Sequence, residues 1–513
     1  MSKLNILVAE DQTEWQDLLM ETLNGLGHDV NVEIASDYST ALRLIKNPKF
    51  DLATVDLELT GAPPISSDTD LSGMELMREW RSSSHNQGCG LIVVTAYPTM
   101  ARQKDALRKY GAFDFIEKEN FNNRTFPAIA RAAILNARLK HATNRKEKRF
   151  HLTVAFNEES LVGCKMTGPA RDTEYVVRHP KRLVVSDLIR RTKELNFKVL
   201  NGDVGGWRPE AKSIGDAIYN TLADEQRIVE NLRMAQALSE QPKDLWLEFS
   251  GPATGLGIPF EFLREGENPL CLRHTLTRRL VQEGAISHNT APFHTFIQRL
   301  QENGEILRLL IVGSNSDGRI PGAEEEAREL KIIIEEDLQT LGILYEITTL
   351  IGEDATYNNV RDALRSGGYH LFHYAGHGRF MDKLPEISGL ILLDSGKPKV
   401  LSAADLNLYV QDSLQFVFLS CCLGARSADQ VGRGDFFGII EALARADIPS
   451  VLGYRWTVAD ASALFLAQSF YESLWRTFSP AESLMEARRD MATNEAGRDD
   501  ETWLSPVLLV QNR

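Results

Sequence analysis

The stretch LQFVFLSCCLGARS (residues 414–427) contains a nearly continuous apolar run that ends in two adjacent cysteines, Cys421 and Cys422. A short apolar run of this kind is typical of a strand that is buried on both faces of a parallel sheet. The two thiols allow four interpretations: core packing, a metal site, one half of a disulfide, or a catalytic nucleophile. The segments on either side of this strand decide the fold class.

Strands and helices alternate on both sides of this run. Further strands are predicted at ILRLLIVGS (306–314), YEITTL (345–350), YHLFHYA (369–375), IPSVLGYRW (448–456) and WLSPVLLVQ (503–511). Amphipathic segments lie between most of them, which predicts a largely parallel sheet with helices on both faces. In such sheets, functional side chains gather at the carboxyl ends of the strands.

The first 140 residues show the same alternation. Five buried strands are predicted at LNILVA (4–9), NVEIAS (31–36), DLATVDL (51–57), GLIVVTA (90–96) and FDFIEK (113–118). Helical patterns separate them, so this region is predicted to be a doubly wound parallel sheet. The whole chain is therefore expected to be of the α/β class.

Composition limits the functional classes. A length of 513 residues suggests about three domains. The net charge of −14 disfavours nucleic acid and membrane surfaces as partners, because both are anionic. No run approaches the roughly 18 apolar residues that a membrane-spanning helix needs. Five cysteines without CxxC spacing indicate neither a zinc site nor a disulfide framework, so a cytoplasmic protein is expected.

The segment between these two regions is chemically quieter. The glycines of GPATGLGIPFEFL (251–263) lack phosphate-loop spacing. Residues 141–150 form a basic linker, which is either a solvated helix end or a lever that transmits the state of the first domain.

Five side chains stand at successive strand ends of the first region: Glu10, Asp11, Asp56, Thr95 and Lys118. Converging carboxylates suit Mg2+, which prefers oxygen ligands. A hydroxyl and an ammonium beside them suit a transferred phosphoryl group. The set therefore predicts a magnesium-dependent phosphorylation site.

Residues 3–140 resemble the response-regulator receiver domain on the basis of these strand ends. The resemblance implies that Asp56 accepts a phosphoryl group from a histidine kinase. It implies that Mg2+ is held by the carboxylates of Glu10, Asp11 and Asp56 and by the backbone carbonyl of Glu58. It also implies that Thr95 and Phe115 form the switch pair and that Lys118 contacts the phosphoryl group.

Two departures from that family stand out. Glu119 follows Lys118 where the family usually has proline, and the glycine after the acceptor comes late, at Gly73. The inserted segment TGAPPISSDTD (60–70) is interpreted either as plain surface or as a loop that alters the phosphorylation lifetime or contacts another domain.

A second reactive pair is expected in the C-terminal sheet. One strand leads into HYAGHGRF (373–380), which contains His377 between two glycines, and another ends at the cysteine pair. A thiol becomes a good nucleophile beside an imidazole, and glycine lets a backbone N–H reach an oxyanion. Core packing of a buried cysteine is the alternative, but Gly376, Gly378 and Gly424 favour a site.

The order of histidine first and cysteine 45 residues later resembles the caspase-like proteases. The motifs HYAGHG, VFLSCCLGA and IPSVLGYRWTVADASA more specifically resemble the CHAT family, over residues 150–513. The resemblance implies that Cys422 is the nucleophile and His377 the base. It also implies that the N–H groups of Gly378 and Cys422 bind the oxyanion, and that no cofactor is needed. Cys421 then stands where the family has alanine.

The substrate pocket of such a fold lies in loops after the strands. An acidic group there would select a basic residue before the cleaved bond, and Asp460 and Asp317 are the candidates. Each is equally a loop carboxylate that caps a helix.

The expected organisation is a receiver domain (1–140), the basic linker (141–150), an inactive caspase-like first half (151–300) and an active caspase-like half (301–513). The expected function is a phosphorylation-controlled cysteine endopeptidase that cleaves a protein. The resemblance suggests bacterial defence or cell death, with a gasdermin-like substrate.

Two alternatives stay open. The chain is a non-enzymatic signalling adaptor, or it is an enzyme whose receiver takes no phosphate and forms a homodimer.

Overall fold

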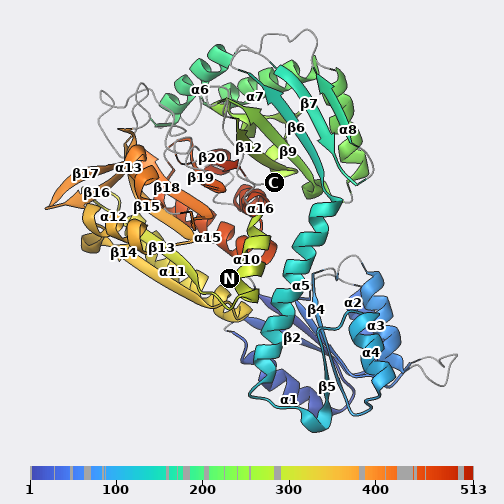
Figure 1. Cartoon of the computed structure of the whole chain (residues 1–513). Coiled ribbons are helices and arrows are strands. Elements are labelled where there is room, and N and C mark those ends of the chain that lie inside the picture. Colours follow the sequence, from blue (N-terminus) through green and yellow to red (C-terminus); the bar gives the residue numbers. More distant parts are fainter. Residues whose placement is uncertain are drawn as a thin grey trace. The chain divides into compact units, whose positions relative to one another are not determined.

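A computed structural model describes most of the chain and shows two compact units (Figure 1). One unit comprises residues 1–144 with 335–344, and the other comprises 145–334 with 345–513. The described residues are 3–27, 29–46, 50–62, 71–83, 86, 88–157, 161–169, 172–176, 185–200, 207–224, 226–239, 241–252, 256–281, 291–379, 387–410, 412–423, 443, 448–456, 458–494 and 502–511.

The first unit is built on a five-stranded sheet whose strand order is β2-β1-β3-β4-β5, with every neighbouring pair parallel. Its strands are β1 (Leu4–Ala9), β2 (Val30–Ala35), β3 (Leu52–Val55), β4 (Gly90–Thr95) and β5 (Asp114–Glu117). Its helices are α1 (Thr13–Asn24), α2 (Tyr38–Ile45), α3 (Ser72–Ser82), α4 (Met100–Arg108) and α5 (Phe126–Lys148). The predicted doubly wound parallel sheet is confirmed.

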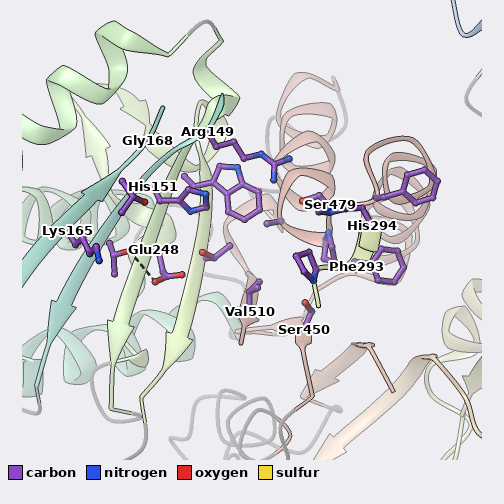
Figure 2. Close-up of a pocket in the computed structure, with 18 residues that line it drawn as sticks. Arg149, His151, Lys165, Gly168, Glu248, Phe293, His294, Ser450, Ser479 and Val510 are labelled. Atoms are coloured by element: carbon purple, nitrogen blue, oxygen red, sulfur yellow. Dashed lines mark hydrogen bonds between the residues drawn. The ribbon is translucent and has the colours of Figure 1, made fainter. Parts of the chain in front are cut away.

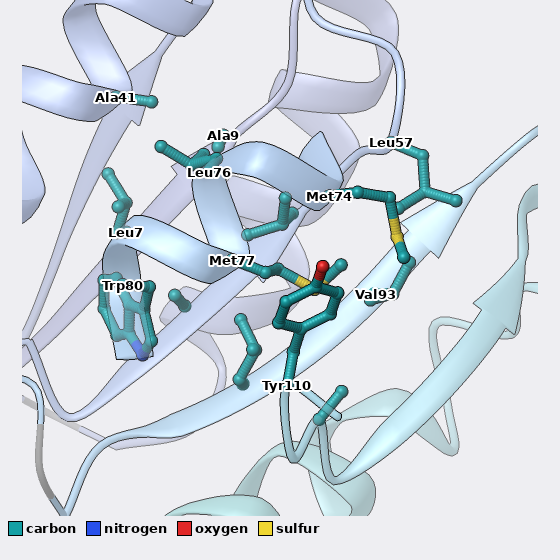
Figure 3. Packing of buried hydrophobic residues seen from close by; sticks show 14 of the residues in the cluster. Leu7, Ala9, Ala41, Leu57, Met74, Leu76, Met77, Trp80, Val93 and Tyr110 are labelled. Carbon is teal, nitrogen blue, oxygen red and sulfur yellow. The ribbon is translucent and has the colours of Figure 1, made fainter. Parts of the chain in front are cut away.

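The core of this unit forms where α3 packs on the sheet (Figure 3). Met74, Met77 and Trp80 recur at a spacing of three residues, which places them on one face of the helix. They are buried together with Leu57 and the strand residues of the same cluster. This packing fixes the carboxyl end of β3, where Asp56 follows.

The second unit contains one long mixed sheet. Its main path runs β14-β13-β15-β18-β19-β20-β12-β9-β6-β7-β8, and β16 and β17 extend it beside β15. The strands are β6 (Phe150–Phe156), β7 (Leu161–Thr167), β8 (Thr173–Val176), β9 (Leu245–Gly251), β12 (Thr275–Leu280), β13 (Leu307–Gly313), β14 (Tyr345–Ile351), β15 (Leu371–Arg379), β16 (Gly389–Asp394), β17 (Lys397–Ser402), β18 (Phe416–Leu423), β19 (Ser450–Tyr454) and β20 (Pro506–Val510).

The helices of this unit are α6 (Val185–Leu200), α7 (Trp207–Ala223), α8 (Gln226–Leu238), α10 (Phe293–Glu302), α11 (Pro321–Leu341), α12 (Tyr357–Ser366), α13 (Ala403–Tyr409), α15 (Asp460–Thr477) and α16 (Pro480–Thr493). The strands β14, β13, β15, β18 and β19 run parallel, and β20 pairs antiparallel with β19. The predicted largely parallel sheet is thus confirmed, and the antiparallel pairings of this region involve β16, β17 and β20.

A buried charge cluster joins the two halves of the long sheet. β12 and β20 touch at the pair Arg278 and Leu509. Behind them the carboxylate of Glu261 is fully buried and forms an ion pair with Arg278, while Arg455 and Arg488 lie 3.6 and 3.7 Å from it. Guanidinium groups from both halves therefore share one carboxylate.

The sequence-predicted boundaries near 140, 150 and 300 stay predictions. The basic linker (141–150) covers the last turns of α5 and the first residue of β6. The segment DFFGIIEALARA (435–446), whose pattern also indicates a helix, lies almost wholly outside the described residues. Among the described helices, none is both long and apolar enough to cross a membrane.

Candidate functional site

The acidic site of the first unit lies at the carboxyl ends of β1 and β3. Glu10 and Asp11 follow β1, Asp56 follows β3, and one oxygen from each lies within 4.8 Å of the others. Lys118 follows β5, and its Nζ lies 2.9 Å from Oε1 of Glu10 and 2.7 Å from Oδ2 of Asp56. All four predicted groups therefore meet at one edge of the sheet.

Burial sets the charges of this site. Glu10 and Asp56 are almost inaccessible to solvent. Burial raises the pKa of Glu10, although the hydrogen bond from Lys118 opposes the rise. Burial alone would lower the pKa of Lys118, but hydrogen bonds to Asp56 and Glu10 outweigh it and the pKa is raised. A buried pair of carboxylates with one ammonium leaves room for a further cation, and the oxygen donor set fits Mg2+.

Gly73 allows the chain that follows β3 to return close to the end of that strand. A Cβ on Gly73 would lie 2.1 Å from the carbonyl oxygen of Asp56, so only glycine fits there. The amide of Gly73 donates to the carbonyl of Leu57 (2.8 Å), and Ser72 Oγ accepts from the amide of Leu59 (2.7 Å). The chain thus returns to β3 after the insertion, whose residues 63–70 lie outside the described part.

The remaining predicted receiver residues lie around this site. Thr95 is buried, and its Oγ1 accepts a hydrogen bond from the amide of Tyr97 (3.2 Å). Phe115 is buried in the core cluster. The amide of Glu58 lies 3.4 Å from Oδ1 of Asp56. Glu119 continues a short 3₁₀ turn that begins at Lys118, and the lysine reaches Asp56 without the usual proline.

The second predicted site lies where β15 and β18 end side by side. The parallel register pairs His377 with Cys422 and Gly376 with Cys421. Successive side chains of a strand alternate between faces, so Cys421 lies on the face opposite His377. The Cys421 thiol is buried on the face that carries Tyr374, and its charge contributes to raising the pKa of that phenol after burial. The side chain of Cys422 and the whole of Gly424 lie outside the described part.

His377 is held by a carboxylate. The ring is 2% exposed, and Nε2 donates a hydrogen bond of 2.8 Å to Oδ1 of Asp317, in the loop between β13 and α11. Nδ1 is buried and has no hydrogen-bond partner among the described residues. Burial alone would raise the pKa of Asp317, but the hydrogen bond from His377 and the Arg319 amide outweigh it and the pKa is lowered. The imidazole is thus oriented with its other nitrogen open.

The glycines beside His377 serve different purposes. A Cβ on Gly376 would lie 2.5 Å from the hydroxyl of Tyr374, so glycine is required by crowding. Gly378 is paired on both sides, with Leu423 of β18 and Leu390 of β16. Its role as an oxyanion donor stays a prediction.

The two candidate pocket carboxylates lie near the start of α11. Asp317 precedes the helix and contacts His377, as described above. Asp460 is the first residue of α15, and the N-cap position before it is held by Ala459, which offers no side-chain cap. A Cβ on Gly322 would lie 2.4 Å from an Asp460 carboxylate oxygen, so this carboxylate faces the first turn of α11. Their roles in a substrate pocket stay predictions.

The structure contains a buried polar network, on the strands β15 and β18, that the sequence analysis did not predict. His373 Nε2 lies 3.1 Å from Glu326 of α11, Ser420 donates to the same carboxylate (3.0 Å), and the hydroxyl of Tyr471 lies 3.2 Å from His373 Nδ1. It links α11 and α15 to the strands that carry His377 and Cys422. The alternation of polar Ser420 and His373 within apolar strands was the available signal.

Two family models match the chain. The response regulator receiver domain matches residues 6–130, and the CHAT domain matches residues 212–509. No curated protein sequence matches the chain.

Solved structures similar to this chain are receiver domains. A CheY-like receiver domain protein from Methanospirillum hungatei is 26% identical, with a TM-score of 0.22, and covers 28% of this chain and 99% of its own. A receiver domain protein from Clostridium thermocellum is 22% identical, with a TM-score of 0.23, and covers 27% and 98%. The receiver domain of a sensor histidine kinase from Pseudomonas aeruginosa, with magnesium in its active-site cleft, is 22% identical, with a TM-score of 0.22, and covers 26% and 98%.

Proposed function

Because the chain belongs to the CHAT domain family of caspase-like cysteine proteases and begins with a response regulator receiver domain, we propose that it is a phosphorylation-controlled cysteine endopeptidase. The observation that carries this proposal is the pairing of His377 with Cys422 in the strand register, with Asp317 bound to the imidazole.

The register favours Cys422 over Cys421 as nucleophile. Cys421 lies on the opposite face of β18 from His377 and is buried against Tyr374, so its thiol has no path to the imidazole. Position 422 is the direct neighbour of His377. Cys421 is therefore assigned to core packing.

The environment of His377 favours Nδ1 as the proton acceptor. Nε2 donates to the carboxylate of Asp317, so in the neutral ring the lone pair lies on Nδ1. Nδ1 takes the proton of the Cys422 thiol as sulfur bonds to the scissile carbonyl carbon. The same proton passes to the leaving amine when the C–N bond breaks, and water then releases the acyl group.

In this scheme Asp317 orients the imidazole. The alternative role in a substrate pocket requires its carboxylate to face the peptide instead, and Asp460 stays the other candidate for that role. A basic residue before the cleaved bond is expected if either carboxylate reaches the substrate.

The receiver unit supplies the control. A receiver domain implies a histidine kinase as the phosphoryl donor. Phosphorylation of Asp56 converts its carboxylate to an acyl phosphate, which carries more negative charge than the carboxylate and places new acceptor oxygens beside Lys118 and Thr95. The charge change reorganises this edge of the sheet with Mg2+ bound, and we propose that this sets the activity of the protease. The same proposal includes a protein substrate in bacterial defence or cell death.

The decisive experiment incubates the purified full chain with Mg2+ and a mixed peptide library, with and without acetyl phosphate. Cys422→Ala is expected to abolish cleavage, and Cys421→Ala, the matched control, is expected to retain it. The cut sites report the residue preferred before the scissile bond.

Asp56→Ala is expected to remove the effect of acetyl phosphate, whichever direction that effect takes. Cleavage that persists in Cys422→Ala contradicts the assignment of the nucleophile. No cleavage by the wild type under either condition contradicts the protease and favours the signalling adaptor. If acetyl phosphate changes cleavage in neither the wild type nor Asp56→Ala, the result favours a receiver that only dimerises.

A further inference from the structure

The first half of the long sheet has two chemically different faces. On one face, Leu152, Val154, Leu247 and Phe249 are buried against residues of α7 and α8. The alternate residues of the same strands are polar or aromatic, namely His151 and Thr153 of β6, Lys165 and Thr167 of β7, Trp246 and Glu248 of β9, and Thr277 of β12. This second face is not built to pack against an apolar partner.

The polar face forms one wall of a cavity of about 390 Å3 (Figure 2). Figure 2 shows the sheet residues on one side and the starts of α10 and α16, with Phe293, His294 and Ser479, on the other. Ser450 and Val510 line the space between them. The volume is within the range of about 300–1,000 Å3 that is typical of small-molecule sites. The cavity is therefore large enough for a ligand the size of a nucleotide.

The charges around this cavity favour an anion. Five ionisable side chains line it, and four are bases (Arg149, His151, Lys165, His294) against one acid (Glu248). The charge of Arg149 is already compensated, because its guanidinium pairs with buried Glu482 and stacks on the ring of Trp246 at 4.6 Å.

Lys165 carries the uncompensated charge of the wall. Its side chain is exposed and has no ion-pair partner among the described residues. In the register Lys165 pairs with Thr153, and Thr153 pairs with Glu248. The hydroxyl of Thr153 donates to Glu248 (3.3 Å), which holds the single carboxylate against β6 while it keeps its charge.

One helix start on the opposite wall adds to this potential. α10 begins after Pro292 without a side-chain cap and without an acidic residue in its first turn. The start of α16 is already satisfied, because Ser479 caps it and Glu482 lies in its first turn. The first amides of a helix and its dipole both favour a negative group nearby.

We propose that this cavity binds a small aromatic anion, which is a planar ring that carries a phosphate or a carboxylate group. The acidic group pairs with Lys165, and the ring lies against His151 and Trp246, whose rings are 5.2 Å apart. Arg149 directly follows α5 in the chain, so such a ligand contacts the first residue after the helix that leaves the receiver.

The test measures binding to the full chain by isothermal titration calorimetry and thermal shift. AMP carries ring and phosphate, indole-3-acetate carries ring and carboxylate, adenosine carries the ring alone, and inorganic phosphate carries the anion alone. AMP or indole-3-acetate is expected to bind more tightly than both partial probes, and the better of the two identifies the acidic group.

Variants locate the site. Lys165→Ala is expected to weaken the better probe about tenfold, the loss that a charge-assisted hydrogen bond typically brings. Lys397→Ala is the matched control, since Lys397 is exposed on β17 and outside the cavity, and it is expected to leave the Kd unchanged. His151→Ala is expected to weaken the ring-bearing probes more than inorganic phosphate.

The proposal is overturned if neither ring-bearing anion binds, if inorganic phosphate binds as well as AMP, or if both cavity variants bind like the wild type. None of these readouts requires peptidase activity. A failure here is therefore distinguishable from a failure of the proposed protease.

Discussion

At the scale of single residues, the hydrogen bond between Asp317 and His377 defines what the imidazole can do. The carboxylate binds Nε2, and Nδ1, the nitrogen that the proposed mechanism uses, has no hydrogen-bond partner among the described residues. The pKa of Asp317 is lowered, because burial alone would raise it but the hydrogen bond from His377 outweighs this effect. The carboxylate therefore stays ionised at pH values where an ordinary carboxyl already binds a proton. Its charge is thus present throughout the pH range in which a cysteine protease operates.

Asp317→Asn is expected to reduce kcat/KM by about tenfold to a hundredfold, less than a general base itself contributes. Asparagine keeps an acceptor for Nε2 but removes the negative charge beside the ring. The loss is therefore expected in kcat, with KM nearly unchanged. The measurement is the kinetics of peptide cleavage for this variant and for Asp354→Asn, an exposed control on the same unit.

A substrate-pocket role for Asp317 gives a different result. The variant then raises KM and changes the preferred residue at the cut site, while kcat stays close to the wild-type value.

Glu10 gives a second prediction at this scale. Burial raises its pKa, so the carboxyl binds a proton at pH values where exposed carboxyls have lost theirs. A proton and Mg2+ compete for the same oxygens, and Mg2+ affinity is expected to fall as the pH drops through this raised pKa.

Trp15 provides the measurement, because Nζ of Lys118 lies 5.1 Å from the centre of its ring. Mg2+ titrations followed by tryptophan fluorescence at neutral and mildly acidic pH report the affinity. Trp15→Phe identifies the responding indole. A Glu10→Gln variant is expected to bind Mg2+ more weakly and with less pH dependence, and equal affinity at both pH values in the wild type would refute the idea.

At the scale of elements, both candidate sites depend on where loops return to the sheet. α3 packs its start directly on the end of β3, with a Cβ on Gly73 only 2.1 Å from the carbonyl oxygen of Asp56 and 2.6 Å from Cα of Leu57. Backbone atoms cannot yield as a flexible side chain does. The insertion after β3 is tolerated because the chain closes again at Ser72 and Gly73.

Gly73→Ala is expected to destabilise the receiver unit by about 1–3 kcal/mol, the usual cost of overpacking. It is also expected to slow labelling of Asp56 by acetyl phosphate, since α3 must move away from β3. Denaturation of the full chain measures the first effect, and phosphoprotein gels measure the second. Gly25→Ala is the matched control, because its Cβ would meet only one backbone oxygen, at 3.3 Å, and its φ is −73°.

In the second unit, the candidate site depends on the register between β15 and β18, which pairs His377 with Cys422. A slip by one residue would bring Cys421 beside His377 and turn every side chain to the other face. The buried network of Glu326, His373 and Ser420 opposes such a slip, because each polar group finds its partner only in this register.

At the scale of the whole molecule, the charge cluster around Glu261 joins the two halves of the long sheet in the second unit. Arg278 belongs to the first half, whereas Arg455 and Arg488 belong to the second. Burial opposes ionisation, but Arg278 and the other guanidinium groups hold the pKa of Glu261 below its usual range. A carboxyl whose pKa is lowered in the folded state contributes stability above its unfolded pKa, and this contribution is lost as the pH falls.

Glu261→Gln is expected to lower the free energy of unfolding of this unit by about 3–5 kcal/mol, as for a broken buried ion pair. The variant is also expected to lose less stability between pH 7 and pH 4 than the wild type, since the titrating group is gone. Urea denaturation at both pH values tests this. Glu353→Gln, which changes an exposed carboxylate of the same unit, is expected to behave like the wild type.

Local patterns in the chain were enough to predict the α/β class, the strands and the residues at their carboxyl ends. These follow from local patterns, since apolar runs form strands and parallel strands place their ends on one edge. Glu10, Asp11, Asp56 and Lys118 were therefore predictable as a set, although they are far apart in the chain. The family resemblances added the expected roles.

Long-range packing set which groups meet across elements. It brought Asp317 to His377 rather than leaving it in an isolated loop, gathered three arginines around Glu261, and enclosed the polar face of the first half-sheet. It also separated Cys421 from His377 by strand register. These contacts depend on how distant segments pack, and no local pattern of hydrophobicity or charge encodes that partnership.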